Sequence, residues 1–423
     1  MSHMEQGAEA GGGVSTRQRK FIYGLLFLVW PFGTALASIK FNREPLAKNI
    51  FWLFCIFFGY TFVIDFQEAD SARYAQRFSE YANSNISFRD LMGDLYSDNT
   101  RQIDIVQPLV TFAMSRVTRN PAWLFAAFAA IFGFFYSRNL WYILERIQGK
   151  KTSLIYLFFV VFALLNPIWL INGFRMYTAI QVFFFGALPY LLEGKKKYLL
   201  WAAASMLVHF SLFLGVVVLL GFALLPRKPV LYYWVFILTS FVKEIDLDIV
   251  RNLLYLLPDV LFYRVQSYTN IEYAKTLEKS AQFTNWYVSF SRDAVIYVSY
   301  ILASYVFFFG REFLQKYDRY RTLFCFALLM VGLANLSSLI PGGGRFMTVG
   351  NLFMYAFFIL YFFHEHRKKV VKLVALATAP LLFIFIVVSI RVGMDFTGMF
   401  TLIGNPLLAF FMEDNVPLIE YLK

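Results

Sequence analysis

Long apolar runs follow one another along almost the whole chain and are separated by short polar turns. Runs of spanning or near-spanning length are expected at about 21–39, 47–65, 121–138, 153–172, 174–193, 198–225, 229–242, 289–310, 321–339, 346–363 and 370–392, with a weaker run near 397–412. The run 198–225 is too long for one span and predicts two short helices, with His209 near its middle. A stretch at about 104–118 contains Gln107 and Pro108, and it fits either a short span or a half-buried helix.

This pattern predicts an all-α polytopic membrane protein with about 11–14 transmembrane helices. Hydrophobic residues make up 59% of the chain and charged residues 16%, whereas soluble domains carry about 25% charged residues. A water-soluble fold is therefore excluded, and residues 17–423 are expected to form a single transmembrane domain. The Gly/Ser/Glu-rich residues 1–16 are expected to be a disordered tail, in which Ser2-His3-Met4 resembles a cloning scar that would place the native start at Met4.

The formal net charge of +12 is explained by where the basic residues lie. They concentrate in short turns that are each separated from the next by a hairpin of two membrane segments, namely 138–151, 195–197, 227–228, 311–321 and 367–369. Cytoplasmic loops carry such an excess of Lys and Arg, so these turns are predicted to face the cytoplasm. A nucleic-acid partner is not expected, because membrane topology accounts for the charge.

Two longer loops, at about 65–120 and 243–290, lack this basic excess and are predicted to face outward. Residues 65–104 hold eight acids and four bases. If 104–118 spans fully, the first loop would face inward instead. The first run is not oriented by charge, since three basic residues precede 21–39 and three follow it.

The first place for chemistry comes directly after the second apolar run, where Asp65, Glu68, Asp70, Arg73 and Tyr74 are close enough to cluster. One carboxylate there would serve as a general base toward a sugar hydroxyl, or would bind sugar hydroxyls directly. The competing interpretation is an ordinary polar helix end at the membrane interface.

Two arginines each head an apolar helix after a tight outward turn. Arg175 follows Asn172-Gly173-Phe174, and Arg345 follows a run of three glycines. The planar guanidinium fork suits phosphate oxygens, and a helix start adds backbone N–H donors. The alternatives are a snorkelling arginine at the first place and a simple hairpin loop at the second.

His209 lies inside an apolar run. Three interpretations are open for its side chain: a base, a donor to a leaving phosphate, or a satisfied structural group. In the predicted topology the cluster after the second run, Arg175, His209 and Arg345 all lie at the same outer membrane boundary, so they would surround one cavity.

Asp246-Leu247-Asp248 has the spacing of a metal-binding pair in nucleotide-sugar transferases, but no βαβ pattern surrounds it. Cys55 and Cys325 both lie in apolar runs, without metal-ligand or disulfide spacing. No metal and no cofactor are therefore expected.

Three passages resemble the EpsG-type family of exopolysaccharide and capsule polymerases, which are related in role to Wzy polymerases. They are 59–74 (GYTFVIDFQEADSARY), 172–181 (NGFRMYTAIQ) and 209–211 (HFS), and Arg345 fits a recurrent arginine near the end of such proteins. The resemblance covers roughly residues 20–365. It departs from the family pattern where Met176 replaces a common Gln, and where the family's early Arg and Gly are not cleanly matched.

The resemblance implies a GT-C-like membrane glycosyltransferase that needs neither metal nor nucleotide sugar. It would join undecaprenyl-diphosphate-linked oligosaccharide repeat units on the extracytoplasmic face of the bacterial inner membrane, by an inverting transfer. The lipid bilayer, a chain-length regulator and a flippase are the further partners that it suggests. We assign the base to Asp65, Asp70 or His209, diphosphate binding to Arg175, Arg345 and Arg73, and glycan binding to Glu68, Tyr74 and Asn172.

Three other functions fit the same pattern less well. A lipid-linked glycan flippase or another transporter would line both halves of the membrane with polar residues, whereas here they gather on one side. A ligase, or a transferase that uses a polyprenyl-phosphate sugar, would share the fold and the cavity. A non-catalytic subunit of a synthesis complex would tolerate substitution of the arginines.

Overall fold

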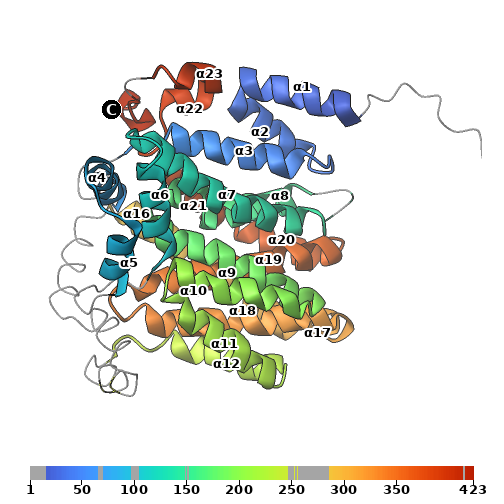
Figure 1. Ribbon diagram of the computed structural model, residues 1–423. Coiled ribbons are helices and arrows are strands. Elements are labelled where there is room, and N and C mark those ends of the chain that lie inside the picture. The colour runs from blue at the N-terminus through green and yellow to red at the C-terminus, as the bar shows by residue number, and fades with distance from the viewer. Residues whose placement is uncertain are drawn as a thin grey trace, which may run out of the picture.

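The computed structural model describes residues 16–64, 70–96, 104–147, 149, 152–245, 252, 255, 285–412 and 415–423. Within these residues the regular structure is helical, and the β contacts are two isolated bridges, Phe62 with Thr397 and Gly398 with Pro417. Figure 1 shows the long helices side by side with roughly aligned axes. Asp246-Leu247-Asp248 and most of the predicted 243–290 loop lie outside the described residues.

The helices from the start of the chain to α12 are α1 (Thr16–Val29), α2 (Pro31–Lys40), α3 (Ala47–Tyr60), α4 (Asp70–Asn83), α5 (Phe88–Tyr96), α6 (Val106–Ser115), α7 (Pro121–Leu144), α8 (Ser153–Leu165), η1 (Ile168–Gly173), α9 (Phe174–Glu193), η2 (Lys196–Tyr198), α10 (Leu199–Val208), α11 (Leu212–Leu224) and α12 (Pro229–Thr239). Those that follow are α16 (Trp286–Phe309), α17 (Arg311–Lys316), α18 (Asp318–Ser337), η4 (Gly343–Arg345), α19 (Phe346–Glu365), α20 (Lys369–Ala377), α21 (Ala379–Gly393), α22 (Met399–Ile403), α23 (Pro406–Ala409) and η5 (Leu418–Tyr421).

Among the described residues, five helical stretches are long and apolar enough to cross a membrane, or six if the bent pair α20–α21 forms one span. They are Pro121–Leu144, Ser153–Glu193, Trp286–Phe309, Asp318–Ser337 and Gly343–Glu365. Several other predicted runs form apolar helices of 10–17 residues, including α3, α11 and α12. The prediction of an all-α polytopic membrane protein is confirmed.

The chain reverses direction between α8 and α9. The rings of Phe162 and Phe184 lie 5.6 Å apart, and the Gln181 side chain donates a 3.0 Å hydrogen bond to the carbonyl of Asn166. Asn139 of α7 donates to the Gln181 side-chain oxygen at 2.7 Å. Pro167 disfavours helical backbone at Asn166 and so ends α8. A buried polar network of Asn139, Asn166 and Gln181 therefore fixes the turn that leads into α9.

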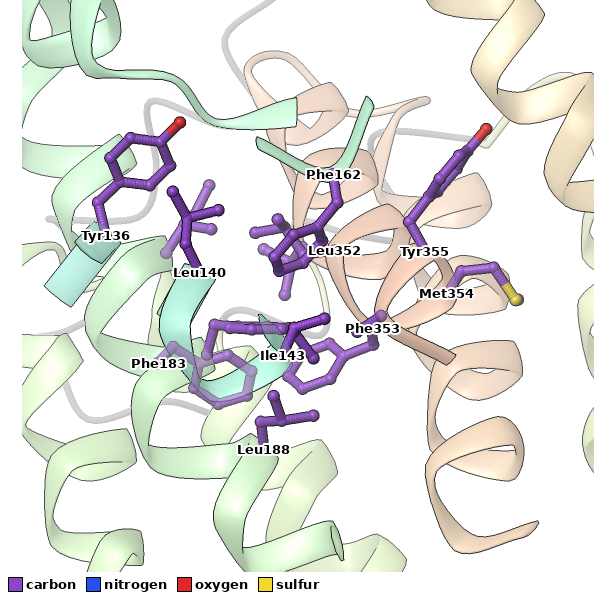
Figure 2. Close-up of a cluster of buried hydrophobic side chains, with 14 of the residues drawn as sticks. Tyr136, Leu140, Ile143, Phe162, Phe183, Leu188, Leu352, Phe353, Met354 and Tyr355 are labelled. Atoms are coloured by element: carbon purple, nitrogen blue, oxygen red, sulfur yellow. The ribbon is translucent and has the colours of Figure 1, made fainter. Parts of the chain in front are cut away.

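Around this turn the interior is filled by large apolar side chains. Figure 2 shows residues of α7, α8, α9 and α19 converging, among them Ile143, Phe162, Phe183 and Phe353. The rings of Phe184 and Phe353 are 4.8 Å apart, a normal separation for a favourable aromatic pair. Because lipid tails are as apolar as these side chains, close packing rather than exclusion of water holds such helices together. The core thus gives the ends of α7, α8 and α9 fixed positions.

The basic turns meet at one end of the bundle, here called the basic end. Arg146, after α7, and Lys195, after α9, both pair with Glu193, and Lys368, before α20, lies 3.7 Å from Glu312 of α17. Figure 1 shows α17 at the right, whereas α4 and α5 lie at the left. The prediction that the basic turns between these helices share one side agrees with this arrangement.

The first predicted span, 21–39, is divided into two helices, which corrects the prediction of one crossing. Pro31 begins α2 after Trp30 has left helical geometry (φ −151°, ψ 86°), because proline lacks an N–H donor and is tolerated only in a first turn. A helix of the 14 residues of α1 is roughly 21 Å long, less than the ~30 Å hydrocarbon core. Figure 1 shows α1 and α2 as a hairpin whose open side faces the basic end. This explains why basic residues flank 21–39 equally.

The other two ambiguous runs are now defined. The run 198–225 forms two helices, as predicted. They are α10 and α11, and the break between them begins at His209. Helix α6 contains 10 residues and is about 15 Å long, so it is too short to cross a bilayer. The first polar loop, with α4 and α5, therefore remains at the end opposite the basic end (Figure 1).

Candidate active site

Asp104 is the centre of a polar cluster at the end opposite the basic end. Its side chain is 3% exposed. One carboxylate oxygen accepts the Phe210 backbone N–H at 2.9 Å. The other lies 2.8 Å from Nδ1 of His209 and accepts a 3.2 Å bond from Arg175. Burial alone would raise the pKa of Asp104, but these donors outweigh it and hold the pKa below its usual value. Asp104 is therefore a charged carboxylate.

Local backbone structure brings Asp104 and His209 together. Helix α10 ends at Val208, and His209 is extended (φ −153°, ψ 118°) before the chain turns into α11. The backbone N–H of Ile105, the residue before α6, donates to the carbonyl of Leu207 at 3.0 Å. This contact joins the start of α6 to the end of α10. The two side chains therefore meet although they are 105 residues apart in sequence.

The contact with Asp104 determines which nitrogen of the His209 ring carries the proton. A carboxylate accepts hydrogen bonds, so Nδ1 carries the proton that it shares with Asp104. In the neutral ring, Nε2 is then the acceptor, and it is the nitrogen that could take a proton from a substrate. The side chain is 16% exposed. When a carboxylate orients a histidine in this way, the histidine can act as a general base.

Arg175 lies in the first turn of α9 and is 34% exposed. The ring of Phe174, the preceding residue, stacks on Phe128 of α7 at 4.0 Å, which anchors the start of the helix. A guanidinium has five N–H donors, and Asp104 accepts from one terminal nitrogen. The Tyr74 hydroxyl also bonds the Arg175 side chain and backbone. The donors that remain on the exposed part of the fork suit an anion.

Helix α4 covers the cluster from the first polar loop. Asp70 forms an ion pair with Arg73, and its carboxylate lies close enough to act electrostatically on Arg175. Tyr74 is buried against Phe128 with its hydroxyl beside Arg175. Burial raises the pKa of Tyr74, and Arg175 lowers it in part, so the phenol stays protonated at neutral pH.

Asn172 has a clear structural contact. Its side-chain oxygen accepts the Ser71 backbone N–H at 3.1 Å, which satisfies one of the free donors at the start of α4. This bond attaches α4 to η1 and brings Asp70 beside the start of α9. Of the predicted glycan-binding residues, Asn172 therefore has its oxygen engaged, and Tyr74 is almost fully buried.

The structure thus brings together six of the nine predicted site residues: Asp70, Arg73, Tyr74, Asn172, Arg175 and His209. Asp65 and Glu68 lie outside the described residues. Arg345 is exposed at the end of η4, which packs against α18 and α19. Within the described part of the chain, no group of three or more His, Cys, Asp or Glu side chains is arranged to hold a metal ion.

The sequence interpretation missed Asp104, the residue that connects the cluster. Asp104 stands at the start of the apolar stretch 104–118. An acid at the edge of such a stretch, just before a helix N-terminus, was the signal that could have identified it as a site residue. Its partners could not be read from spacing, since they are 71 and 105 residues away.

A carboxylate-oriented histidine beside a partly exposed arginine is suited to transferring a group away from a phosphate. In comparisons with known proteins, the family model described as the EpsG family matches residues 49–397, more than four fifths of the 423 residues. The match includes every residue of the cluster. No curated protein and no solved structure matches the chain.

Proposed function

This chain belongs to the EpsG family, and from that premise we propose that it is a polysaccharide polymerase. It joins undecaprenyl-diphosphate-linked oligosaccharide repeat units at the outer face of the bacterial inner membrane. One observation carries the proposal: the Asp104 carboxylate contacts both His209 and Arg175. A proton acceptor and a phosphate-binding group are thereby held side by side, as glycosyl transfer from a lipid diphosphate requires.

In this proposal His209 is the general base. Its Nε2 removes the proton from a hydroxyl of the acceptor repeat unit, and the hydroxyl oxygen then forms a bond to the anomeric carbon of the donor glycan. The imidazolium that results is stabilised by the Asp104 carboxylate at 2.8 Å. A general base contributes typically 10²–10⁴-fold to a rate.

Arg175 acts on the leaving group. The bond between the anomeric carbon and the diphosphate oxygen breaks, and its electron pair leaves with the undecaprenyl diphosphate. Arg175 binds the departing diphosphate more strongly as negative charge develops, which lowers the barrier. Attack from the face opposite the diphosphate inverts the anomeric centre. The hydroxyl proton ends on His209, so the step needs neither a metal ion nor a nucleotide sugar.

The remaining predicted residues take supporting roles. Asp70 is paired with Arg73 and close to Arg175, so it suits sugar hydroxyl binding better than proton removal. Arg345, exposed after Gly342–Gly344, is proposed to hold the second lipid diphosphate. The basic end faces the cytoplasm, as the excess of Lys and Arg in its short loops indicates.

The test is turnover by purified full-length protein in nanodiscs. The protein receives a matched undecaprenyl-diphosphate oligosaccharide, with chelator present and nucleotide sugar omitted, and the readout is a ladder of longer glycans. We expect wild-type protein to make the ladder, and His209→Ala and Arg175→Ala to lose it. Arg119→Ala is the matched control, because Arg119 is an exposed arginine in the turn between α6 and α7.

Three outcomes would argue against the proposal. A folded wild-type protein that makes no ladder from a verified substrate would favour a flippase or an accessory subunit. A ladder that chelator abolishes would exclude metal independence. A ladder that survives His209→Ala but not Asp70→Asn would transfer the role of base to Asp70.

A further inference from the structure

An apolar groove lies between helix α1 of the N-terminal hairpin and the start of α3. Its volume is about 540 Å³. Helix α1 forms one wall, from Lys20 to Leu28, and the start of α3 forms the other, from Leu46 to Leu53. The α1 wall precedes the range 49–397 that matches the family. None of the residues that line the groove belongs to the cluster around Asp104, so the groove is separate from the proposed polymerase site.

Polar groups in the groove lie at the basic end. Lys20 is exposed in α1, and Asn49 lies in the first turn of α3. Arg138 donates a 2.7 Å hydrogen bond to the side-chain oxygen of Asn49, so the group that Asn49 offers to a ligand is its NH₂. Residues 16–49 hold six basic residues and one acid. The mouth of the groove thus presents the positive charge of Lys20 and the amide donor of Asn49.

The rest of the groove is apolar and has the length of a lipid chain in one leaflet. Nine residues of α1, from Lys20 to Leu28, rise about 12 Å, and half of the hydrocarbon core is about 15 Å. Leu25 and Leu28 remain about half exposed. No Cβ contact within 4 Å would be made at Gly24, so the wall of α1 is open at that position. The α1 lining of the groove ends at Leu28.

We propose that this groove binds one anionic phospholipid of the inner leaflet. Its phosphate is recognised by Lys20 and the Asn49 NH₂, and one acyl chain lies between α1 and α3. Basic pockets between membrane helices on the cytoplasmic side bind anionic headgroups in this manner. The lipid would fill the space that the short hairpin leaves open and would hold α1 against α3.

The test is native mass spectrometry of the full-length protein after titration with phosphatidylglycerol or phosphatidylcholine. We expect one phosphatidylglycerol to bind with preference over phosphatidylcholine. Lys20→Gln should weaken it about fivefold, as the loss of one basic residue near a membrane surface predicts. Gly24→Leu should abolish binding, because the new side chain occupies the groove.

Matched controls separate this site from bulk lipid. Gly221→Leu adds the same side chain at another open helical glycine, and Lys372→Gln removes an exposed lysine near the start of α20. Both should bind phosphatidylglycerol as wild-type protein does. Equal binding of phosphatidylcholine would overturn the headgroup assignment. Undiminished phosphatidylglycerol binding by Gly24→Leu would show that the lipid binds elsewhere. Displacement of phosphatidylglycerol by substoichiometric undecaprenyl phosphate would assign the groove to a polyprenyl chain.

Discussion

Replacing Asp104 by Asn gives the sharpest test of the cluster, because it keeps the shape of the side chain and removes its charge. The amide oxygen can still accept the Phe210 N–H, but the NH₂ then faces the donors on His209 and Arg175. To accept a hydrogen bond from this NH₂, Nδ1 of His209 must give up its proton. The ring then carries its proton on Nε2 and no longer has an acceptor for the substrate hydroxyl.

The magnitude follows from the charge that the His209 and Arg175 contacts lose. A hydrogen bond to a charged group contributes roughly 1.5–3 kcal/mol, and the share of Arg175 is smaller because that side chain is 34% exposed. We expect a loss of about 2–4 kcal/mol in the free energy of unfolding from these contacts. The rate of polymerisation should fall about 10²–10⁴-fold, which is the usual contribution of a general base.

The assay compares initial rates of glycan elongation and thermal unfolding for wild-type, Asp104→Asn and Asp90→Asn proteins. Asp90 is the control, because it is an exposed carboxylate in α5 at the same end of the bundle and bonds Ser87. Asp90→Asn should elongate at the wild-type rate. A folded Asp104→Asn protein that also elongates at that rate would refute the assignment of His209 as a base oriented by Asp104.

Two further predictions concern the contacts of Asp104, and a third concerns the polar network of Gln181. Arg175→Lys, which keeps the charge but not the fork, should slow elongation at least ~10-fold; a wild-type rate would show that a point charge suffices. The lowered pKa of Asp104 means that its carboxylate stabilises the fold above the unfolded pKa of about 4 and that this stabilisation is lost as pH falls through the lower folded pKa. The unfolding temperature should thus decline in that acidic range in wild-type protein and decline less in Asp104→Asn. If the two proteins lost the same unfolding temperature over this pH range, protonation of Asp104 would not be the cause. Gln181→Leu should lower stability by about 1–2 kcal/mol in a thermal melt, because the Asn139 side chain loses an acceptor and the Asn166 backbone carbonyl loses a donor. An unchanged melt would mean that the network contributes nothing.

Much of the helical arrangement followed from hydrophobic runs alone. Long apolar runs leave few options, because a membrane requires every backbone group to be bonded within its own helix. The division of the run 198–225 into two helices was also predictable, since the run is longer than one span. The hairpin of α1 and α2 was not predicted, although Pro31 and the equal basic flanks of 21–39 both indicated it.

The site was predictable in its parts but not in its connections. Arg175 and His209 stood out because ionisable side chains within apolar runs are costly. Asp104 lies at the edge of a run, where a carboxylate is unremarkable, and its importance depends on two long-range contacts. Arg345 had the same local signature as Arg175, yet it is exposed at the end of η4. A helix-start arginine therefore does not by itself identify a member of the cluster.

The spacing of Asp104 from its partners has a consequence for how the protein is made. Chains emerge from the ribosome amino terminus first, so Asp104 is synthesised 71 residues before Arg175 and 105 residues before His209. An unpaired aspartate is costly in a bilayer, which keeps the α6 segment at the water surface during early insertion. Only after α9 and α10 have entered the membrane can this carboxylate become buried. The cluster around Asp104 is thus completed only when about half of the 423 residues have been made, and a chain interrupted before residue 209 lacks the His209 partner of Asp104.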